Sequence, residues 1–144
     1  MIDRLNNYRY LKERWLSIVE EISNLKYARD NYQPPTLSSV VGGISSGNVS
    51  SPTENAAVNS LYFYEEVDRK IKEKEKEKAD IEREIAELDE YIDGIEDATI
   101  KKIVEFHYRK GYGWRRTAEV AYYAPNSWYY VKRMVTDYIN SHTF

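Results

Sequence analysis

The run YRKGYGWRRTAEVAYYAP, residues 108–125, decides the fold of the last third of this chain. A glycine pair in it ends a helical pattern over about 97–109, and a second short pattern follows over about 114–122. A third pattern begins at Pro125, whose ring suits the first turn of a helix. Two short helices joined by a tight turn, with another helix before them, predict a three-helix helix-turn-helix unit over residues 95–144.

Helical phase divides the last of these helices into two faces. Its apolar side chains recur at spacings of three and four, so we expect them to face the core: Trp128, Val131, Val135 and Tyr138. In a helix-turn-helix unit the second helix of the pair enters the major groove of DNA and presents its N-terminal residues to the base edges. The predicted base contacts are therefore Asn126, Ser127, Tyr129, Tyr130 and Arg133.

Charge is segregated along the chain, although the net charge is only −3. Residues 59–93 carry 7 basic and 13 acidic side chains, whereas residues 94–144 carry 8 basic and 5 acidic ones. The basic end is thus the predicted helix-turn-helix unit, and basic side chains there suit DNA phosphates. The predicted phosphate contacts are Arg115, Arg116 and Lys132, with Lys101 and Lys102 as weaker candidates.

The N-terminal segment, residues 1–33, carries an apolar stripe at helical spacing: Leu5, Tyr8, Leu11, Trp15, Ile18, Ile22 and Leu25. It predicts one helix from about Ile2 to Ala28. Residues 34–50 are rich in Ser, Gly and Pro and predict a connector. The four residues Ser51 to Glu54 form a capping box with proline at the first helical position, which predicts a helix start.

A long helix is predicted over residues 51–94, because no proline or glycine follows Pro52 until Gly94. Its residues at spacings of three and four form a heptad seam: Tyr64, Val67, Ile71, Lys74, Lys78, Ile81, Ile85, Leu88, Ile92 and Ile95. The predicted fold class is therefore all-α, with the N-terminal helix folded antiparallel on the long charged helix. Self-association into a homodimer is the other use of so long a seam.

The remaining composition argues against an enzyme. The chain has no cysteine and two separated histidines, of which His107 is expected to pack or cap a helix rather than bind a metal. The carboxylates of residues 59–93 alternate with lysines on a solvated helix and offer no enclosed acid/base pair. We expect no catalytic residue, metal or cofactor. With neither a secretion signal nor a membrane span in view, we also expect a cytoplasmic protein without a membrane partner.

The run from Tyr108 to Trp114, continued by Thr117-Ala118-Glu119, Tyr123-Ala124-Pro125 and Val131-Lys132-Arg133, resembles sigma-factor region 4. The chain is most similar to small transcriptional regulators of phages and prophages of Gram-positive bacteria, the ArpU-like and RinA-like late-gene activators. Gly42 to Ser46 and the run SPTENAAV, residues 51–58, also resemble those proteins. Gly113 and Ala124 stand where the family often has serine, and Trp128 replaces a smaller apolar residue.

This resemblance implies double-stranded promoter DNA as a partner, and RNA polymerase as a second one. It implies an accessory regulator rather than a free-standing sigma factor, because no counterpart of the promoter-melting region is present. Two alternatives remain open at this point. One is a protein-binding module that inhibits or redirects a host protein through the long helix or the Tyr129-Tyr130 face. The other is a small DNA-packaging subunit.

Overall fold

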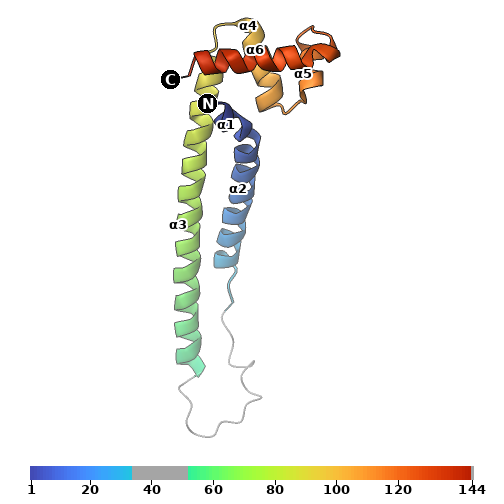
Figure 1. Cartoon of the computed structure of the whole chain (residues 1–144). Coiled ribbons are helices and arrows are strands. Elements are labelled where there is room, and N and C mark those ends of the chain that lie inside the picture. The colour runs from blue at the N-terminus through green and yellow to red at the C-terminus, as the bar shows by residue number, and fades with distance from the viewer. Residues whose placement is uncertain (34–51, 144) are drawn as a thin grey trace. The chain divides into compact units, whose positions relative to one another are not determined.

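The computed structural model describes the backbone of residues 1–33 and 52–143, and the side chains of residues 1–33 and 59–143. Every regular element in those ranges is a helix (Figure 1), so the predicted all-α fold class is confirmed. In chain order the elements are α1 (Ile2–Asn6), α2 (Tyr8–Asp30), α3 (Pro52–Asp93), α4 (Ala98–Val104), η2 (Glu105–Arg109), α5 (Trp114–Val120), η3 (Pro125–Ser127) and α6 (Trp128–Ser141). The predicted connector over residues 34–50 and the Ser51 cap lie outside the described residues.

The N-terminal segment forms two helices where one was predicted. The break falls at Asn7, which has φ −87° and ψ −4° and whose N–H donates to the Arg4 carbonyl oxygen at 3.1 Å. That bond spans three residues, so the last turn of α1 is tighter than an α-helix. Beyond the break α2 runs for 23 residues, to Asp30.

The described residues pack as two compact units. The described residues of unit 2, 17–33 and 52–78, form a pair of antiparallel helices, the later part of α2 and the first part of α3. Tyr32, two residues after α2 ends, stacks on Phe63 at 4.0 Å, whereas Glu21 within α2 has its Oε2 3.0 Å from Lys74 Nζ. The later residue on the N-terminal side therefore meets the earlier residue of α3, as in an antiparallel pair. Its buried seam is made by four side chains: Ile18, Ile22, Val67 and Ile71.

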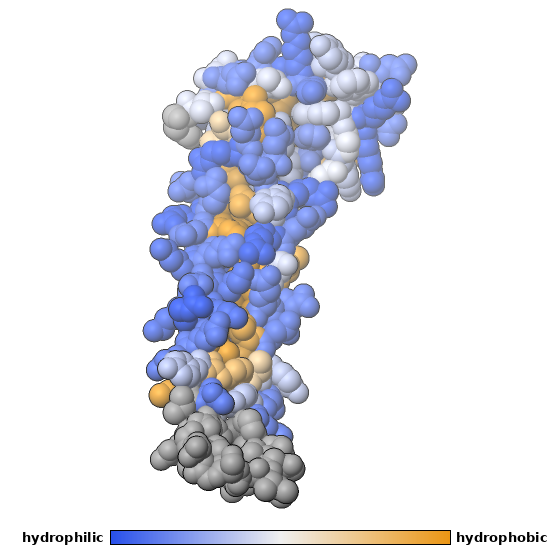
Figure 2. Space-filling model, turned by 60° about the horizontal axis from the view of Figure 1, so that its bottom comes forward, coloured by the Kyte–Doolittle hydropathy of each residue, from blue (hydrophilic) through white to orange (hydrophobic). Residues whose placement is uncertain are grey.

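The polar middle of the predicted heptad seam is partly buried. Lys74 and Lys78 are half-buried, because the aliphatic stem of a lysine can pack while its ammonium stays in water. Tyr64 is 38% exposed and lies edge-on to Phe63 at 5.7 Å, so it marks the end of the seam rather than its core. On the face drawn in Figure 2, apolar atoms of the paired helices show as narrow orange strips between blue polar side chains.

Unit 1 comprises residues 1–16 and 79–144. Here too the helix pair is antiparallel: the Tyr8 hydroxyl donates to Asp89 Oδ1 at 2.8 Å, and Trp15 Nε1 donates to Glu82 Oε1 at 2.9 Å. The C-terminal helices α4, α5 and α6 belong to the same unit, and α6 packs on both α5 and α4. The helix pair and the C-terminal helices of unit 1 share one core. Its fully buried side chains come from both: Leu5, Leu88, Ile92, Ile103, Val104, Val131, Val135 and Ile139.

Candidate nucleic-acid interface

The first helix of the C-terminal unit, α4, is capped by Asp97. The Asp97 carboxylate accepts the N–H groups of Thr99 at 2.9 Å and Ile100 at 3.0 Å. An N-cap of this kind satisfies donors that the first helical turn leaves free. After Val104 the helix widens into the π-turn η2, in which the N–H of Lys110 donates to the Glu105 carbonyl oxygen at 3.0 Å.

His107 holds the loop between η2 and α5. Its ring stacks on Trp114 with centroids 3.7 Å apart, and Nδ1 donates to the Tyr112 carbonyl oxygen at 2.7 Å. Burial lowers the pKa of this histidine, and the nearby charge of Lys132 adds to the effect. His107 therefore packs and fastens the loop, as the sequence predicted, and Thr117 assists by donating to the Gly113 carbonyl oxygen at 2.9 Å.

The turn between α5 and α6 contains a tyrosine in the left-handed backbone region. Tyr122 has φ +66°, the conformation that glycine usually occupies after a helix end. The N–H of Tyr123 donates back to the Ala118 carbonyl oxygen at 2.8 Å, which closes the turn. Ala118 and Ala121 are buried at 0% and 9% exposure, so these small side chains let the turn and α6 approach closely.

The core face of α6 differs in part from the prediction. Val131 and Val135 are fully buried, as predicted. Trp128 and Tyr138, however, are only half-buried, and Ile139 takes a core position that the prediction omitted. Trp128 starts α6 directly after the 3₁₀ turn η3, where its ring meets Tyr129 edge-on at 5.5 Å instead of entering the core.

The opposite face of α6 and the turn before it are open to solvent. Asn126 and Arg133 are exposed, Tyr129 and Tyr130 are 67% and 59% exposed, and Ser127 is half-buried. Positions 126, 129, 130 and 133 lie three or four apart, so they follow one helical face. The five predicted base-contact residues thus stand together at the N-terminal end of α6.

The predicted phosphate contacts fall into two groups. Arg115 and Arg116 are exposed in the first turn of α5, and Lys132 is exposed on α6. Lys101 and Lys102 lie on α4 and are half-buried. The Lys102 ammonium lies 4.4 Å from the centre of the Tyr122 ring, so this side chain contacts the turn between α5 and α6.

Two exposed cations that the prediction omitted lie at the loop before α5. Lys110 is one, and its position beside a glycine turn was visible in the sequence. Arg9 is the other: its guanidinium lies against Gly111, where a Cβ atom would meet Arg9 Nη1 at 2.0 Å. No local pattern places Arg9 there, because the contact joins α2 to a loop far away in the chain.

A cluster of charged groups centred on Arg109 ties the loop and η2 to α3. The Arg109 guanidinium lies 2.9 Å from Asp89 Oδ1, 3.1 Å from Asp93 Oδ1 and 3.2 Å from Glu105 Oε1. Partial burial lowers the pKa of Arg109, but Asp93 and Asp89 together outweigh it, so the pKa is raised. Arg109 is neutralised and only 22% exposed, so it is a structural residue and not a candidate for phosphate contact.

A cleft of about 740 Å³ opens elsewhere in unit 1, between the N-terminus, the end of α3 and the end of α6. Its guanidinium, from Arg4, is already bound by Glu84 at 2.7 Å and Glu87 at 2.6 Å. The remaining charged walls include Glu90 and Glu96. This acidic lining is unsuited to a polyanion, so the cleft is separate from the candidate interface.

Comparisons with protein-family models, curated proteins and solved structures found no match to the chain. Among the described residues, no helix is long and apolar enough to span a membrane, and no three acidic, histidine or cysteine side chains gather as metal ligands would. The candidate interface consists of an exposed face on α6 and exposed cations around the start of α5.

Proposed function

We propose that this chain is a sequence-specific, double-stranded DNA-binding transcription regulator of phage or prophage genes, which acts at promoters through RNA polymerase. The observation that carries the proposal is the joint exposure of Asn126 and Arg133 on one end of α6 beside the exposed arginines of α5. Asparagine and arginine are the side chains suited to bidentate contacts with adenine and guanine. The resemblance to sigma-factor region 4 supports the promoter as the target.

The test begins with selection of bound duplexes from a random library, followed by fluorescence anisotropy on the enriched duplex across a salt series. Arg133→Gln is expected to relax the preference at one base pair and to cost about 1–3 kcal/mol on the enriched sequence. Arg115→Gln is expected to weaken all duplexes alike and to lower the salt slope by about 0.9. No enrichment, together with binding that is absent or insensitive to salt, would overturn the proposal.

The exposed tyrosines favour a second candidate function, a protein-binding module that inhibits or redirects a host protein. Tyr129 and Tyr130 expose large rings beside Arg133, and tyrosine and arginine are common at the energetic centres of protein interfaces. Affinity purification after nuclease treatment tests this candidate. Recovery of a stoichiometric host protein by the wild type, and its loss with the double variant Tyr129→Ser and Tyr130→Ser, would favour it over DNA binding.

A further inference from the structure

The loop before α5 concentrates positive charge, most of which has no ion-pair partner among the described residues. Residues 109–116 hold four cationic side chains and no carboxylate. Arg109 is bound by three carboxylates. The other three, Lys110, Arg115 and Arg116, are exposed and form no ion pair within residues 1–33 and 59–143.

Two aromatic rings hold two of these cations in place. Phe106 and Tyr112 stack with centroids 5.3 Å apart. The Lys110 ammonium lies 4.3 Å from the centre of the Phe106 ring, and the Arg116 guanidinium carbon lies 4.0 Å from the centre of the Tyr112 ring. A ring face attracts a cation without cancelling its charge. The pair therefore restrains both side chains and leaves their full charge for a partner.

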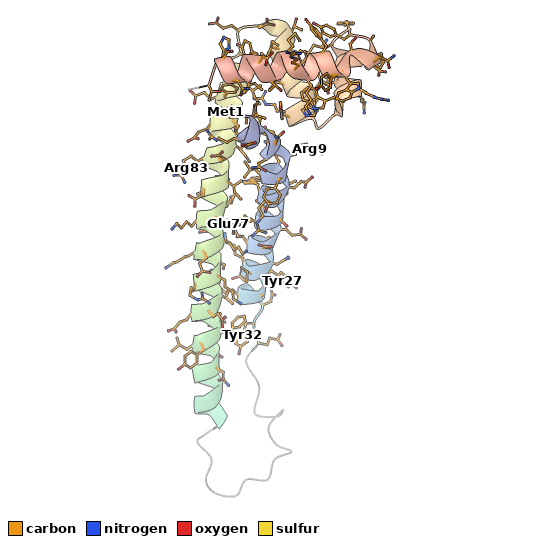
Figure 3. The ribbon with its side chains drawn as sticks, viewed as in Figure 1. Met1, Arg9, Tyr27, Tyr32, Glu77 and Arg83 are labelled. Atoms are coloured by element: carbon orange, nitrogen blue, oxygen red, sulfur yellow. The ribbon has the colours of Figure 1, made fainter. Side chains whose placement is uncertain are left out.

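Arg9 brings a further cation to the same loop from α2. Its guanidinium packs against Gly111, whose φ of +75° and missing side chain leave the room that Arg9 occupies. Glu13, one turn further along α2, makes no ion pair with it. Figure 3 shows Arg9 on α2 and Arg83 on α3, at opposite sides of the helix pair in unit 1. We call Arg9, Lys110 and Arg116 the loop cluster.

We propose that the loop cluster is a second contact surface for the phosphate backbone of duplex DNA, so that the N-terminal helix takes part in binding. This inference rests on the proposed function. The phosphodiester backbone of DNA suits the cluster, because its cations are exposed and form no ion pair with the described side chains, and no carboxylate interrupts residues 109–116. Arg116 of the cluster and its neighbour Arg115 are already candidates for phosphate contact at the start of α5, and the cluster adds Arg9 and Lys110 to them. It adds affinity and orientation, whereas the α6 face supplies the preference for sequence.

The experiment measures anisotropy of a labelled mixed-sequence duplex of about 30 bp while the NaCl concentration is raised from about 50 to 300 mM. Arg9→Gln and Lys110→Gln each remove one charge from the cluster, and Arg83→Gln is the matched control. Arg83 is 67% exposed and pairs with Asp80 on its own helix. Arg9→Lys tests whether charge alone restores binding, and circular dichroism checks that each variant keeps its helix content.

Arg9→Gln and Lys110→Gln are each expected to lower the slope of log affinity against log salt concentration by about 0.9. Each should also weaken binding at 0.1 M salt by about 8-fold. Arg83→Gln is expected to match the wild type, and Arg9→Lys to keep the slope. If the wild type binds and the cluster variants match it, or if Arg83→Gln loses the same slope, the inference is overturned while the proposed function stands. If the wild type itself fails to bind duplexes, the proposed function fails and the inference with it.

Discussion

Replacing Arg109 by methionine should loosen the C-terminal helices from α3. Methionine keeps the aliphatic stem and removes the guanidinium, which joins Asp89 and Asp93 of α3 to Glu105 of η2. The Asp89 carboxylate also accepts the Tyr8 hydroxyl at 2.8 Å, so the same cluster reaches the N-terminal helix. The perturbation therefore acts on three segments of unit 1 at once.

The size of the effect follows from how exposed each pair is. The Asp93 side chain is 62% exposed, and the Glu105 pair spans four residues of one helix, so each contributes about 0.5 kcal/mol. The Asp89 side chain is 34% exposed; its Oδ1 accepts the Nε–H of Arg109 at 3.0 Å and lies 2.9 Å from Nη2, and the Asp89 carbonyl oxygen accepts an Nη2–H at 3.2 Å. Hydrogen bonds between charged groups contribute about 1.5–3 kcal/mol, and partial exposure places this pair at the lower end. Arg109→Met should thus lower the free energy of unfolding by about 2–2.5 kcal/mol.

Urea unfolding followed by tryptophan fluorescence measures this loss directly, because all three tryptophans, at positions 15, 114 and 128, belong to unit 1. Arg83→Met is the control, since Arg83 and its partner Asp80 are 67% and 54% exposed. It should cost no more than about 0.5 kcal/mol. Asp89→Asn combined with Arg109→Met should show a coupling energy of about 1 kcal/mol. An Arg109→Met variant no less stable than Arg83→Met would refute the reasoning.

Three further predictions concern the loops. Gly111→Ala should destabilise the fold by about 1–2 kcal/mol because of its φ of +75°. Gly113→Ala, at φ −61° and in open space, should cost only about 0.5 kcal/mol, because Gly113 is the N-cap of α5 and alanine is disfavoured there; equal thermal melts of the two variants would contradict this. Tyr122→Gly should stabilise by about 0.5 kcal/mol, since relief of the left-handed backbone exceeds the lost contact with Lys102, and a lower melting temperature would argue against it. The pKa of His107 is lowered in the folded state, so the unfolded chain binds a proton first and stability should fall as pH drops below about 6.5. His107→Gln should be less stable at pH 7.5 but should lose this acid sensitivity, and melts of both proteins at pH 7.5 and 5.5 compare the slopes.

The pairing of the helices was predictable because each side of the seam is a local pattern. Isoleucine and leucine at spacings of three and four marked the buried stripe of α3, and the same rule found Ile18 and Ile22 on α2. The rule was less reliable in the short α6, where Trp128 is only half-buried and Ile139 is buried instead. A pattern of two or three turns fixes its phase poorly, and packing at the helix ends decides which residue enters the core.

The sequence by itself determined which segments could form the candidate interface. They are the basic C-terminal segment, the glycine turn and the polar face of the last helix. These follow from composition and helical phase, which are properties of neighbours in the chain. Only the tertiary structure decided that Arg109 is paired with carboxylates while Lys110 beside it forms no ion pair with the described side chains. It also decided that Arg9 lies on Gly111. The physical reason is that charge becomes available or neutralised through contacts between distant segments, and those contacts arise only when a shared core brings the segments together.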